Sequence, residues 1–489
     1  MKIVLFTLNG SWAHTSLSLR CLRPPLERDG HEVLLIEHTL RDRTGHVLEQ
    51  LYAAGADVYG FSCYIWNLTP LLELAEALHE LLPDAAIVLG GPEVSYDTQR
   101  FASLPYIRSI VCGEGEEAFA TLCNALERGE RVDRVIVADP PCVMRNEGIL
   151  YRNGEAQGRI LYYESSRGCP YRCAYCLSSA TEGVRAKSVA QTLCDLEAFE
   201  HLDGDCKIVK FVDRTFNANV KRANAIWQAL LDVRFTKHYH FEVCASLLNE
   251  ESFQILSQFP KGKIQLEFGL QSTHLPTLAA SSRHVDPTEV LTAVRRVHAM
   301  GNIHVHLDLI AGLPFESYRR FAQSFDDAYG SCDLLQLGFL KLLHGTELCR
   351  RKEEYGYKCL PYPPYTVLES HWISYEELQR LSHIAEVLER FLESGRFVHV
   401  LHLLTPHMAS PFAFWEGLTA YLRAVDPRPL QKLSQPDVFL YLLGYIKKTF
   451  PDLSENAVKE RLAADFAQHE HKNPPGFLKA QAEAERKQI

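Results

Sequence analysis

This sequence lacks long apolar runs and an excess of basic residues. Its 489 residues contain no uninterrupted apolar run of about eighteen residues, so no membrane-spanning helix is predicted. The formal net charge of -10 at pH 7 argues against a nucleic-acid partner, because such proteins usually carry a basic patch. The apolar run that begins at Met1 is too short for a signal peptide and predicts a first β-strand. No internal repeat or low-complexity tract interrupts the chain.

Cysteine is also missing from the last part of the chain, since all fourteen cysteines lie at or before Cys359. With no secretory signal, they predict reduced thiols and a cytoplasmic location. Three of them, Cys169, Cys173 and Cys176, directly follow a predicted strand at Arg159–Ser165. Thiolates at this spacing can hold three corners of an iron–sulfur cluster. Because a cubane cluster has four irons, three ligands leave one iron open to a substrate or cofactor.

A structural zinc site is the alternative for this trio, but tetrahedral zinc normally takes a fourth Cys or His. Neither residue type occurs between Leu177 and Ala190. The pattern Cys-x3-Cys-x2-Cys, with Tyr175 before the last cysteine, resembles the loop of the radical S-adenosylmethionine (SAM) superfamily. The resemblance implies a 4Fe-4S cluster whose open iron binds SAM.

Residues 1–140 alternate between strand-like and helical patterns. Helical spacing is seen, for example, in Thr69–Leu82. This alternation predicts a doubly wound parallel sheet, which binds ligands at the carboxyl ends of its strands. The strand-like runs are Lys2–Leu8, Glu32–Ile36, Val58–Ser62, Ala86–Leu89 and Ser109–Val111.

Three of these predicted strands lead into candidate ligand-binding loops, and two of the loops carry glycines. The three loops contain the residues Ser62, Tyr64, Gly90, Gly91, Gly113, Glu114 and Gly115. Glycine lets a backbone approach a ligand closely. The loops resemble those of the cobalamin-binding domain that precedes many radical SAM cores, and the resemblance implies that these seven residues contact a corrinoid. A domain that kept the fold and lost the cofactor is the alternative.

The cobalt-binding motif of that family, Asp-x-His-x-x-Gly, is missing here. Asp29 and His31 begin it, but Leu34 occupies the glycine position. His14, in the loop after the first strand, is a second candidate ligand. The resemblance therefore implies a corrinoid held without a protein imidazole.

Residues 158–350 contain six strand candidates separated by helical patterns, which is typical of a partial (β/α)6 barrel of the TIM type. The candidates are Arg159–Ser165, Lys207–Asp213, His240–Ala245, Lys263–Gln271, Ile303–Ile310 and Leu334–Leu340. Outer helices demand the apolar face of each strand, so the polar face should line the barrel. A polar lumen predicts a cavity for cofactor and substrate. The predicted substrate-pocket residues are Glu242, Glu267, His304, His306 and Asp308. Metal ligation is the alternative role for the two histidines.

Three further segments resemble the SAM-binding segments of the radical SAM core. The resemblance implies that SAM is contacted by Tyr175, Asp213, Gln271, Ser272, Ile310 and Gly312. A buried polar network without a ligand is the alternative role for Asp213 and Gln271.

Residues 360–489 are predicted to form an α-helical C-terminal region after a stiff connector at Pro361–Tyr365. Helical periods occur at Glu376–Ser394, Ser410–Ala424, Asp437–Lys448 and Asn456–Ala467, and the end of the chain at Ala480–Ile489 is expected to fray. The region resembles a helical extension of unassigned function behind some cobalamin-type radical SAM cores. Its position predicts a lid or a substrate-recognition element.

Together the resemblances imply a cobalamin-type radical SAM enzyme that acts on a small molecule. It would remove a hydrogen atom from an unreactive carbon and then methylate that carbon. Its cofactors would be a 4Fe-4S cluster, SAM and cobalamin, with a flavodoxin or ferredoxin as the reducing partner. A radical rearrangement or cyclisation is one alternative. A non-catalytic corrinoid or iron–sulfur sensor is the alternative from another class.

Overall fold

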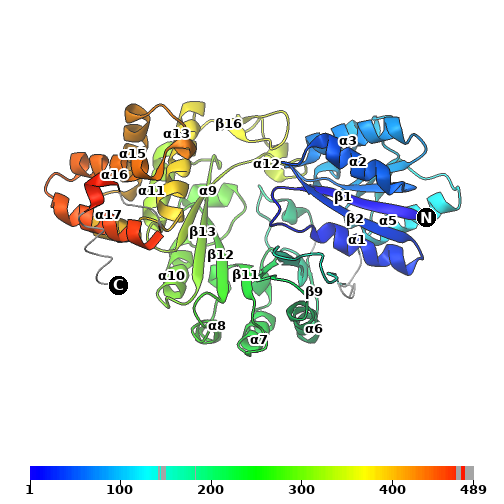
Figure 1. Ribbon diagram of the computed structural model, residues 1–489, viewed down its shortest axis with the longest axis horizontal. Helices are drawn as coiled ribbons and strands as arrows, with labels where there is room; N and C mark the ends of the chain where they lie inside the picture. The colour runs from blue at the N-terminus through cyan, green and yellow to red at the C-terminus, as the bar shows by residue number, and fades with distance from the viewer. Residues whose placement is uncertain (141–143, 145–149, 182, 470–474, 480–489) are drawn as a thin grey trace.

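The computed structural model describes residues 1–140, 144, 150–181, 183–469 and 475–479 of the 489-residue chain. These residues form three parts arranged along the long axis of the molecule (Figure 1): a parallel sheet covered by helices, a half-barrel and a group of helices. The predicted fold class is therefore confirmed. Within this described part, no helix combines the length and the apolar character needed to cross a membrane.

The N-terminal sheet has the strand order β2-β1-β3-β4-β5-β6, and its strands pair in parallel. The strands are β1 (Lys2–Asn9), β2 (Glu32–Thr39), β3 (Val58–Ser62), β4 (Ala86–Gly90), β5 (Ser109–Cys112) and β6 (Val135–Val137). The helices between them are α1 (Leu17–Arg28), α2 (Thr44–Ala54), α3 (Leu68–Leu81), α4 (Thr98–Ala102) and α5 (Gly115–Glu127). All of β3 is buried, as expected for a parallel strand with helices on both faces.

Two separate hydrophobic clusters show that the sheet is doubly wound. Leu19 of α1 and Phe119 of α5 belong to the cluster on one face. Val47 of α2 and Leu71 of α3 belong to the cluster on the other. The carboxyl ends of the parallel strands all lie at one end of the sheet. The loops predicted to hold a ligand follow strands at this carboxyl end.

The central part is a half-barrel whose strand order β7-β10-β11-β12-β13-β14 follows the chain. The parallel strands are β7 (Leu161–Tyr163), β10 (Ile208–Phe211), β11 (His238–Val243), β12 (Ile264–Gln271), β13 (His304–Ala311) and β14 (Leu334–Phe339). Its helices are α6 (Val189–Glu200), α7 (Val220–Leu230), α8 (Glu250–Leu256), α9 (Leu275–Ala280), α10 (Pro287–His298) and α11 (Tyr318–Ala328). No described pairing joins β14 to β7, so the barrel is partial, as predicted.

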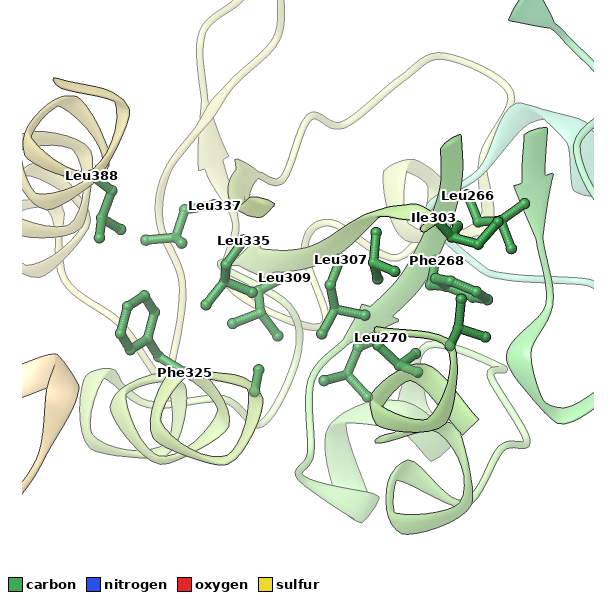
Figure 2. Close-up of a cluster of buried hydrophobic side chains, with 14 of the residues drawn as sticks. Leu266, Phe268, Leu270, Ile303, Leu307, Leu309, Phe325, Leu335, Leu337 and Leu388 are labelled. Atoms are coloured by element: carbon green, nitrogen blue, oxygen red, sulfur yellow. The ribbon is translucent and has the colours of Figure 1, made fainter. Parts of the chain in front are cut away.

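Apolar side chains on one face of the barrel strands form the core against the helices. Figure 2 shows Leu307 and Leu309 of β13 beside Leu270 of β12, with Phe325 of α11 facing Leu335 of β14. Strand β12 alternates strictly between buried and half-buried residues. The alternation places Glu267 on the opposite face, inside the barrel, which agrees with the polar lumen expected from the sequence.

The first barrel strand is shorter than the predicted Arg159–Ser165. Strand β7 ends at Tyr163, because the next main-chain groups turn toward Asp213: the Ser165 amide donates a hydrogen bond of 2.7 Å to its carboxylate. The chain then enters a two-stranded antiparallel hairpin made of β8 (Ser166–Gly168) and β9 (Val184–Ala186). The cysteines lie between these two strands.

The C-terminal part contains the predicted helices. Its helical elements are α13 (Tyr375–Leu388), the π-helix η5 (Glu389–Glu393), α14 (Val398–Leu404), α15 (Pro411–Val425), α16 (Gln435–Thr449) and α17 (Glu455–His469). Between the barrel and these helices come α12 (Glu347–Arg350), β15 (Lys358–Cys359) and β16 (Val367–Glu369). A capping box between Ser374 and Glu377 begins α13. Helix α15 packs against α11 of the barrel, and Leu388 of α13 lies near Leu337 of β14 (Figure 2). The predicted frayed end, 480–489, lies outside the described residues.

Candidate functional site

The cysteine loop lies at the carboxyl end of the barrel and is held there by main-chain hydrogen bonds. The Ala174 amide donates to the Ser281 carbonyl over 2.9 Å, and the Leu348 amide donates to the Ala174 carbonyl over 2.9 Å. The thiols of Cys169, Cys173 and Cys176 are partly or wholly buried and lie close enough to influence one another electrostatically. Such a set of three soft sulfur ligands on one loop suits an iron–sulfur cluster.

Arg283 is a candidate site residue that the sequence analysis did not include. Its Nη1 atom lies 3.8 Å from the Cys173 sulfur, and its Nη2 donates to the Gly269 carbonyl. Its buried Nε has no hydrogen-bond partner in the described structure. A buried guanidinium with a free N–H fits a site that receives a negatively charged group, such as a thiolate-bound cluster or a carboxylate. A single arginine between two helices looks like a surface residue in the sequence.

The predicted SAM-contacting residues differ in whether their polar groups already have hydrogen-bond partners. The Gln271 backbone has a φ of 72°, and its buried Oε1 has no described partner, so its amide is available to a ligand. Ser272 instead donates a 2.5 Å hydrogen bond to buried Glu316. The Gly312 carbonyl accepts a hydrogen bond of 2.9 Å from Tyr357. Ile310 lies one residue before the end of β13, and Tyr175 is packed against the barrel core.

Asp213 has a different environment from the SAM contact that the resemblance implied. The fully buried carboxylate accepts hydrogen bonds from the Ser165 amide, the Ser165 hydroxyl and the Ser166 hydroxyl over 2.7, 2.6 and 2.5 Å. These donors occupy both of its oxygens, so the geometry supports the alternative of a buried polar network. Its effect is to fix the main chain that leads into the cysteine hairpin.

A cavity of about 1060 Å³ lies between the carboxyl end of the N-terminal sheet and the mouth of the barrel. The sheet side is lined by the predicted residues Ser62, Tyr64, Gly90, Gly91, Gly113, Glu114 and Gly115. The barrel side is lined by Tyr162, Glu164, Ser166, Arg167, Gly168, Val212 and Arg214. The cavity therefore joins the loops predicted to bind a corrinoid to the hairpin that carries the cysteines.

Two loops of the cavity wall pack closely at Gly91. Gly91 has a φ of 107°, and a Cβ there would lie 2.5 Å from the Cys63 carbonyl oxygen, so glycine lets these loops approach each other. Nearby, Tyr64 and Trp66 stack with ring centroids 4.5 Å apart. Among the described lining residues, His14 is the one imidazole. These features fit a large, mostly apolar cofactor such as a corrinoid.

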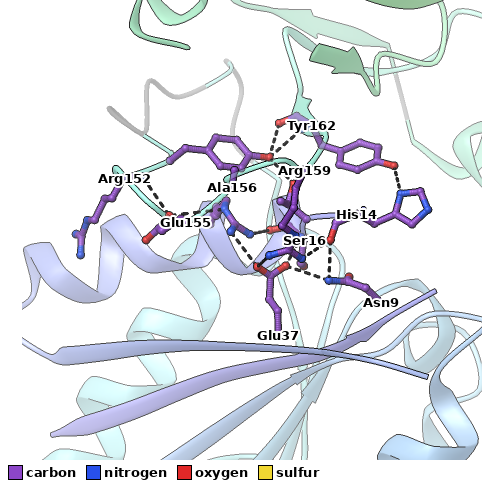
Figure 3. Close-up of polar contacts among 12 residues, drawn as sticks. Asn9, His14, Ser16, Glu37, Arg152, Glu155, Ala156, Arg159 and Tyr162 are labelled. Atoms are coloured by element: carbon purple, nitrogen blue, oxygen red, sulfur yellow. Dashed lines mark hydrogen bonds and ion pairs between the residues drawn. The ribbon is translucent and has the colours of Figure 1, made fainter. Parts of the chain in front are cut away.

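His14 is already engaged with the barrel. Its Nδ1 lies 2.7 Å from the Tyr162 hydroxyl (Figure 3). Burial, followed by the charges of Lys210 and Arg159, lowers its pKa. In the same network, Glu37 of β2 accepts from Arg20 over 2.9 Å and from Arg159 over 3.2 Å. These contacts fix the segment before β7 onto the N-terminal sheet.

A second group of ion pairs fastens the cysteine hairpin to the same sheet. Arg167 of β8 lies 2.9 Å from Glu114, 2.7 Å from Glu116 and 2.6 Å from Glu164. Arg185 of β9 also pairs with Glu114. The carboxylate of Glu114, predicted to face a corrinoid, is therefore shared with two arginines of the hairpin.

The lumen of the barrel brings together four of the five predicted substrate-pocket residues. Glu242, Glu267, His306 and Asp308 lie on neighbouring inward-facing positions of β11, β12 and β13. Burial raises the pKa of Glu242 to about 7, although the charge of Arg214 opposes this shift. His304 does not join them: its side chain is 43% exposed and lies near Asp333 at the other end of the strand.

Comparison with known proteins identifies three matching families along the chain. The B12 binding domain family matches residues 2–123, and the Radical SAM superfamily matches residues 163–328. A family described as protein of unknown function (DUF4080) matches residues 353–489.

Two curated relatives are methyltransferases. The chain is 29% identical over 326 residues to the 2-(S-pantetheinyl)-carbapenam-3-carboxylate methyltransferase of Streptantibioticus cattleyicolor, covering 58% of this chain and 45% of that protein. It is 25% identical over 427 residues to the cobalamin-dependent radical SAM methyltransferase TokK of Streptomyces tokunonensis, covering 75% of this chain and 61% of that protein. The chain thus spans about half the length of the first relative and three fifths of the second.

Solved structures share the fold. The cobalamin-dependent SAM radical enzyme OxsB, with aqua-cobalamin and SAM bound, gives a TM-score of 0.65 at 15% identity, over 100% of this chain and 81% of that one. The radical SAM methyltransferase TsrM from Kitasatospora setae, with cobalamin and a [4Fe-4S] cluster bound, gives a TM-score of 0.59 at 17% identity, over 74% of this chain and 78% of that one. Along the chain, residues 2–123 thus match a B12 binding domain, residues 163–328 match the Radical SAM superfamily, and residues 353–489 match a family of unknown function.

Proposed function

We propose that this protein is a cobalamin-dependent radical SAM enzyme that methylates an unactivated carbon of a small molecule. The observation that carries the proposal is the cavity of about 1060 Å³, because it opens both to the corrinoid-type loops and to the cysteine hairpin. A ligand in this cavity would contact Arg214, whose guanidinium lies 3.9 Å from Glu242 of the barrel lumen. That is the arrangement needed to pass a one-carbon group to a substrate inside the barrel.

In this proposal Cys169, Cys173 and Cys176 hold a 4Fe-4S cluster, and the cavity glycines Gly90, Gly91 and Gly113 face cobalamin. When bound, these cofactors supply reductive cleavage of SAM and a transferable methyl group. Sequence relatives with methyltransferase names support this activity.

The chain's own residues bind and orient. Arg283 presents a buried guanidinium beside Cys173, suited to the carboxylate of SAM. Gln271 offers an amide oxygen without a partner at the end of β12. Glu242 and Asp308 face the lumen and would hold polar groups of the substrate.

The proposal includes a one-electron reductant of the flavodoxin or ferredoxin class, because the cluster must be reduced in each cycle. It also includes a reducing compartment such as the cytoplasm. None of the thirteen described cysteines pairs in a disulfide, which supports this location.

The test is anaerobic turnover with SAM that carries a deuterated methyl group. The reconstituted protein is incubated with a metabolite extract from a strain that lacks it, and labelled small molecules are identified by mass spectrometry. We expect a labelled methyl group in one product, with S-adenosylhomocysteine and 5′-deoxyadenosine formed together. Deoxyadenosine without label in any product would refute methyl transfer and favour rearrangement or cyclisation. No SAM cleavage by fully loaded protein would favour a sensor.

A further inference from the structure

A cluster of metal-ligating side chains occupies the middle of the barrel lumen. Glu267 of β12 is in register with His306 of β13, and Asp308 follows on the same face. The ligand atoms of these three side chains all lie within 4.8 Å of one another. His240 of β11 adjoins them, with its Nε2 atom 2.8 Å from the Glu267 Oε2 atom.

The atoms of this cluster are close but poorly aligned for hydrogen bonding. The Nε2 atom of His306 lies 3.0 Å from the Asp308 Oδ1 atom, yet this buried nitrogen makes no hydrogen bond. The same holds for the Nε2 atom of His240 beside Glu267. Two ligand atoms that lie about 2.1 Å from one ion, at right angles, are about 3.0 Å apart. The observed separation is that of an ion pair, and it equally suits two neighbouring ligands of one metal ion.

We propose that Glu267, His306 and Asp308 form a binding site for a divalent transition-metal ion within the barrel, separate from the cysteine loop. Two carboxylates and an imidazole are the ligand set of Zn²⁺, Mn²⁺ and Fe²⁺, whereas Cu⁺ prefers sulfur. His306 is 8% exposed, so the ion would be shielded from bulk water. Three protein ligands leave coordination positions open for oxygen or nitrogen atoms of a small molecule in the lumen.

Other charged groups around the site set its affinity. Lys210 of β10 places its Nζ atom 3.5 Å from the Glu267 Oε2 atom and competes with the ion for that carboxylate. Glu393 adds negative charge near the ring of His306, and Glu242 adds negative charge near Glu267 and Asp308. Removing the positive charge of Lys210 should therefore strengthen metal binding, an effect that a purely structural role for these residues does not produce.

The probe is Mn²⁺, because it prefers carboxylate and imidazole ligands and leaves the thiols of the cysteine loop available to softer metals. The full chain, stripped of metal with a chelator, is titrated with Mn²⁺, and the free ion is followed by electron paramagnetic resonance. We expect one bound ion per chain. His306→Ala and Asp308→Ala should each weaken binding by at least about tenfold, whereas Lys210→Met should strengthen it.

His304→Ala is the matched control, since His304 lies two positions before His306 on the same strand and its side chain is 43% exposed. It should leave Mn²⁺ binding unchanged. His306→Gln, which keeps the size and polarity of the ring, guards against misfolding, and thermal unfolding checks each variant. Absence of Mn²⁺ binding, or binding that His306→Gln and Asp308→Ala leave unchanged in folded protein, would overturn the proposal. Because the titration uses neither SAM nor cobalamin, its failure leaves the proposed methyl transfer untouched.

Discussion

The Nη1 atom of Arg167, in the hairpin that carries the cysteines, lies 2.9 Å from the Glu114 Oε2 atom at the carboxyl end of the N-terminal sheet. The same guanidinium contacts Glu116 and Glu164. The four side chains are only 13–22% exposed, so the pairs are poorly screened by water. One arginine therefore holds the cofactor loop of the sheet and the cysteine hairpin in a fixed relation.

Replacing Arg167 by Met should lower the free energy of unfolding by about 3 kcal/mol, because it leaves three half-buried carboxylates without this partner. The unfolding midpoint in urea measures the change. Arg234→Met is the control: it removes an ion pair with Glu197 whose side chains are 56% and 41% exposed, and it should cost less than about 1 kcal/mol. Equal losses in the two variants would contradict the role given to Arg167.

Each of the variants Cys169→Ala, Cys173→Ala and Cys176→Ala should lose the iron–sulfur absorption and SAM cleavage, since a cluster with two thiolate ligands is not retained. Absorption after anaerobic reconstitution and the amount of 5′-deoxyadenosine measure the two effects. Cys194→Ala, at an exposed position of α6, should behave like the unmodified protein. Stoichiometric zinc without iron in the anaerobically purified protein would contradict the cluster assignment.

Gly90→Leu should abolish binding of hydroxocobalamin while leaving the protein folded. A Cβ at Gly90 meets only the Val111 carbonyl oxygen, at 3.6 Å, so the added side chain extends into the cavity rather than into packed protein. Corrinoid absorbance that stays with the protein after gel filtration measures binding.

Two controls frame the corrinoid experiment. Gly45→Leu, in α2, has no atom within 4 Å of the new Cβ and should retain the pigment. His14→Ala should also retain it, with a spectrum typical of cobalamin without an imidazole ligand, because His14 is bonded to Tyr162. If the protein never retains the pigment, the sheet is a scaffold without the cofactor.

Glu316 should make stability depend on pH. Burial raises its pKa from 4.5 to about 7, although hydrogen bonds from Ser272 and Ser324 oppose the shift. The folded state then binds the proton more tightly than the unfolded state, so the free energy of unfolding falls as pH rises from about 4.5 to 7. The expected fall is about 3 kcal/mol.

Glu316→Gln should remove this fall, because its amide does not titrate. Urea unfolding at pH 5 and pH 8 measures the difference between the variant and the original protein. Glu353→Gln, at a position whose side chain is 91% exposed, serves as the control and should leave the pH dependence as it is. A variant at position 316 with the full pH dependence would show that other groups cause it.

The sequence by itself determined the fold class and the cysteine loop. The periods of β1 to β5 and of the barrel strands are local properties of the chain, and the spacing of Cys169, Cys173 and Cys176 is fixed within one loop. Inward-facing polar positions on β12 and β13 followed from the alternation of side chains along a strand, which needs no tertiary information.

Only the tertiary structure decided how the parts combine. The Asp213 carboxylate accepts hydrogen bonds from Ser165 and Ser166. Arg283 lies beside the Cys173 sulfur, although the two residues are 110 positions apart in the chain. Glu114 forms an ion pair with Arg167, and the cavity exists, because the N-terminal sheet faces the barrel. No local sequence pattern specifies how these two parts are placed. Ion pairs and hydrogen bonds of this kind depend on the direction of each side chain in space, whereas a sequence pattern records only periodicity along the chain.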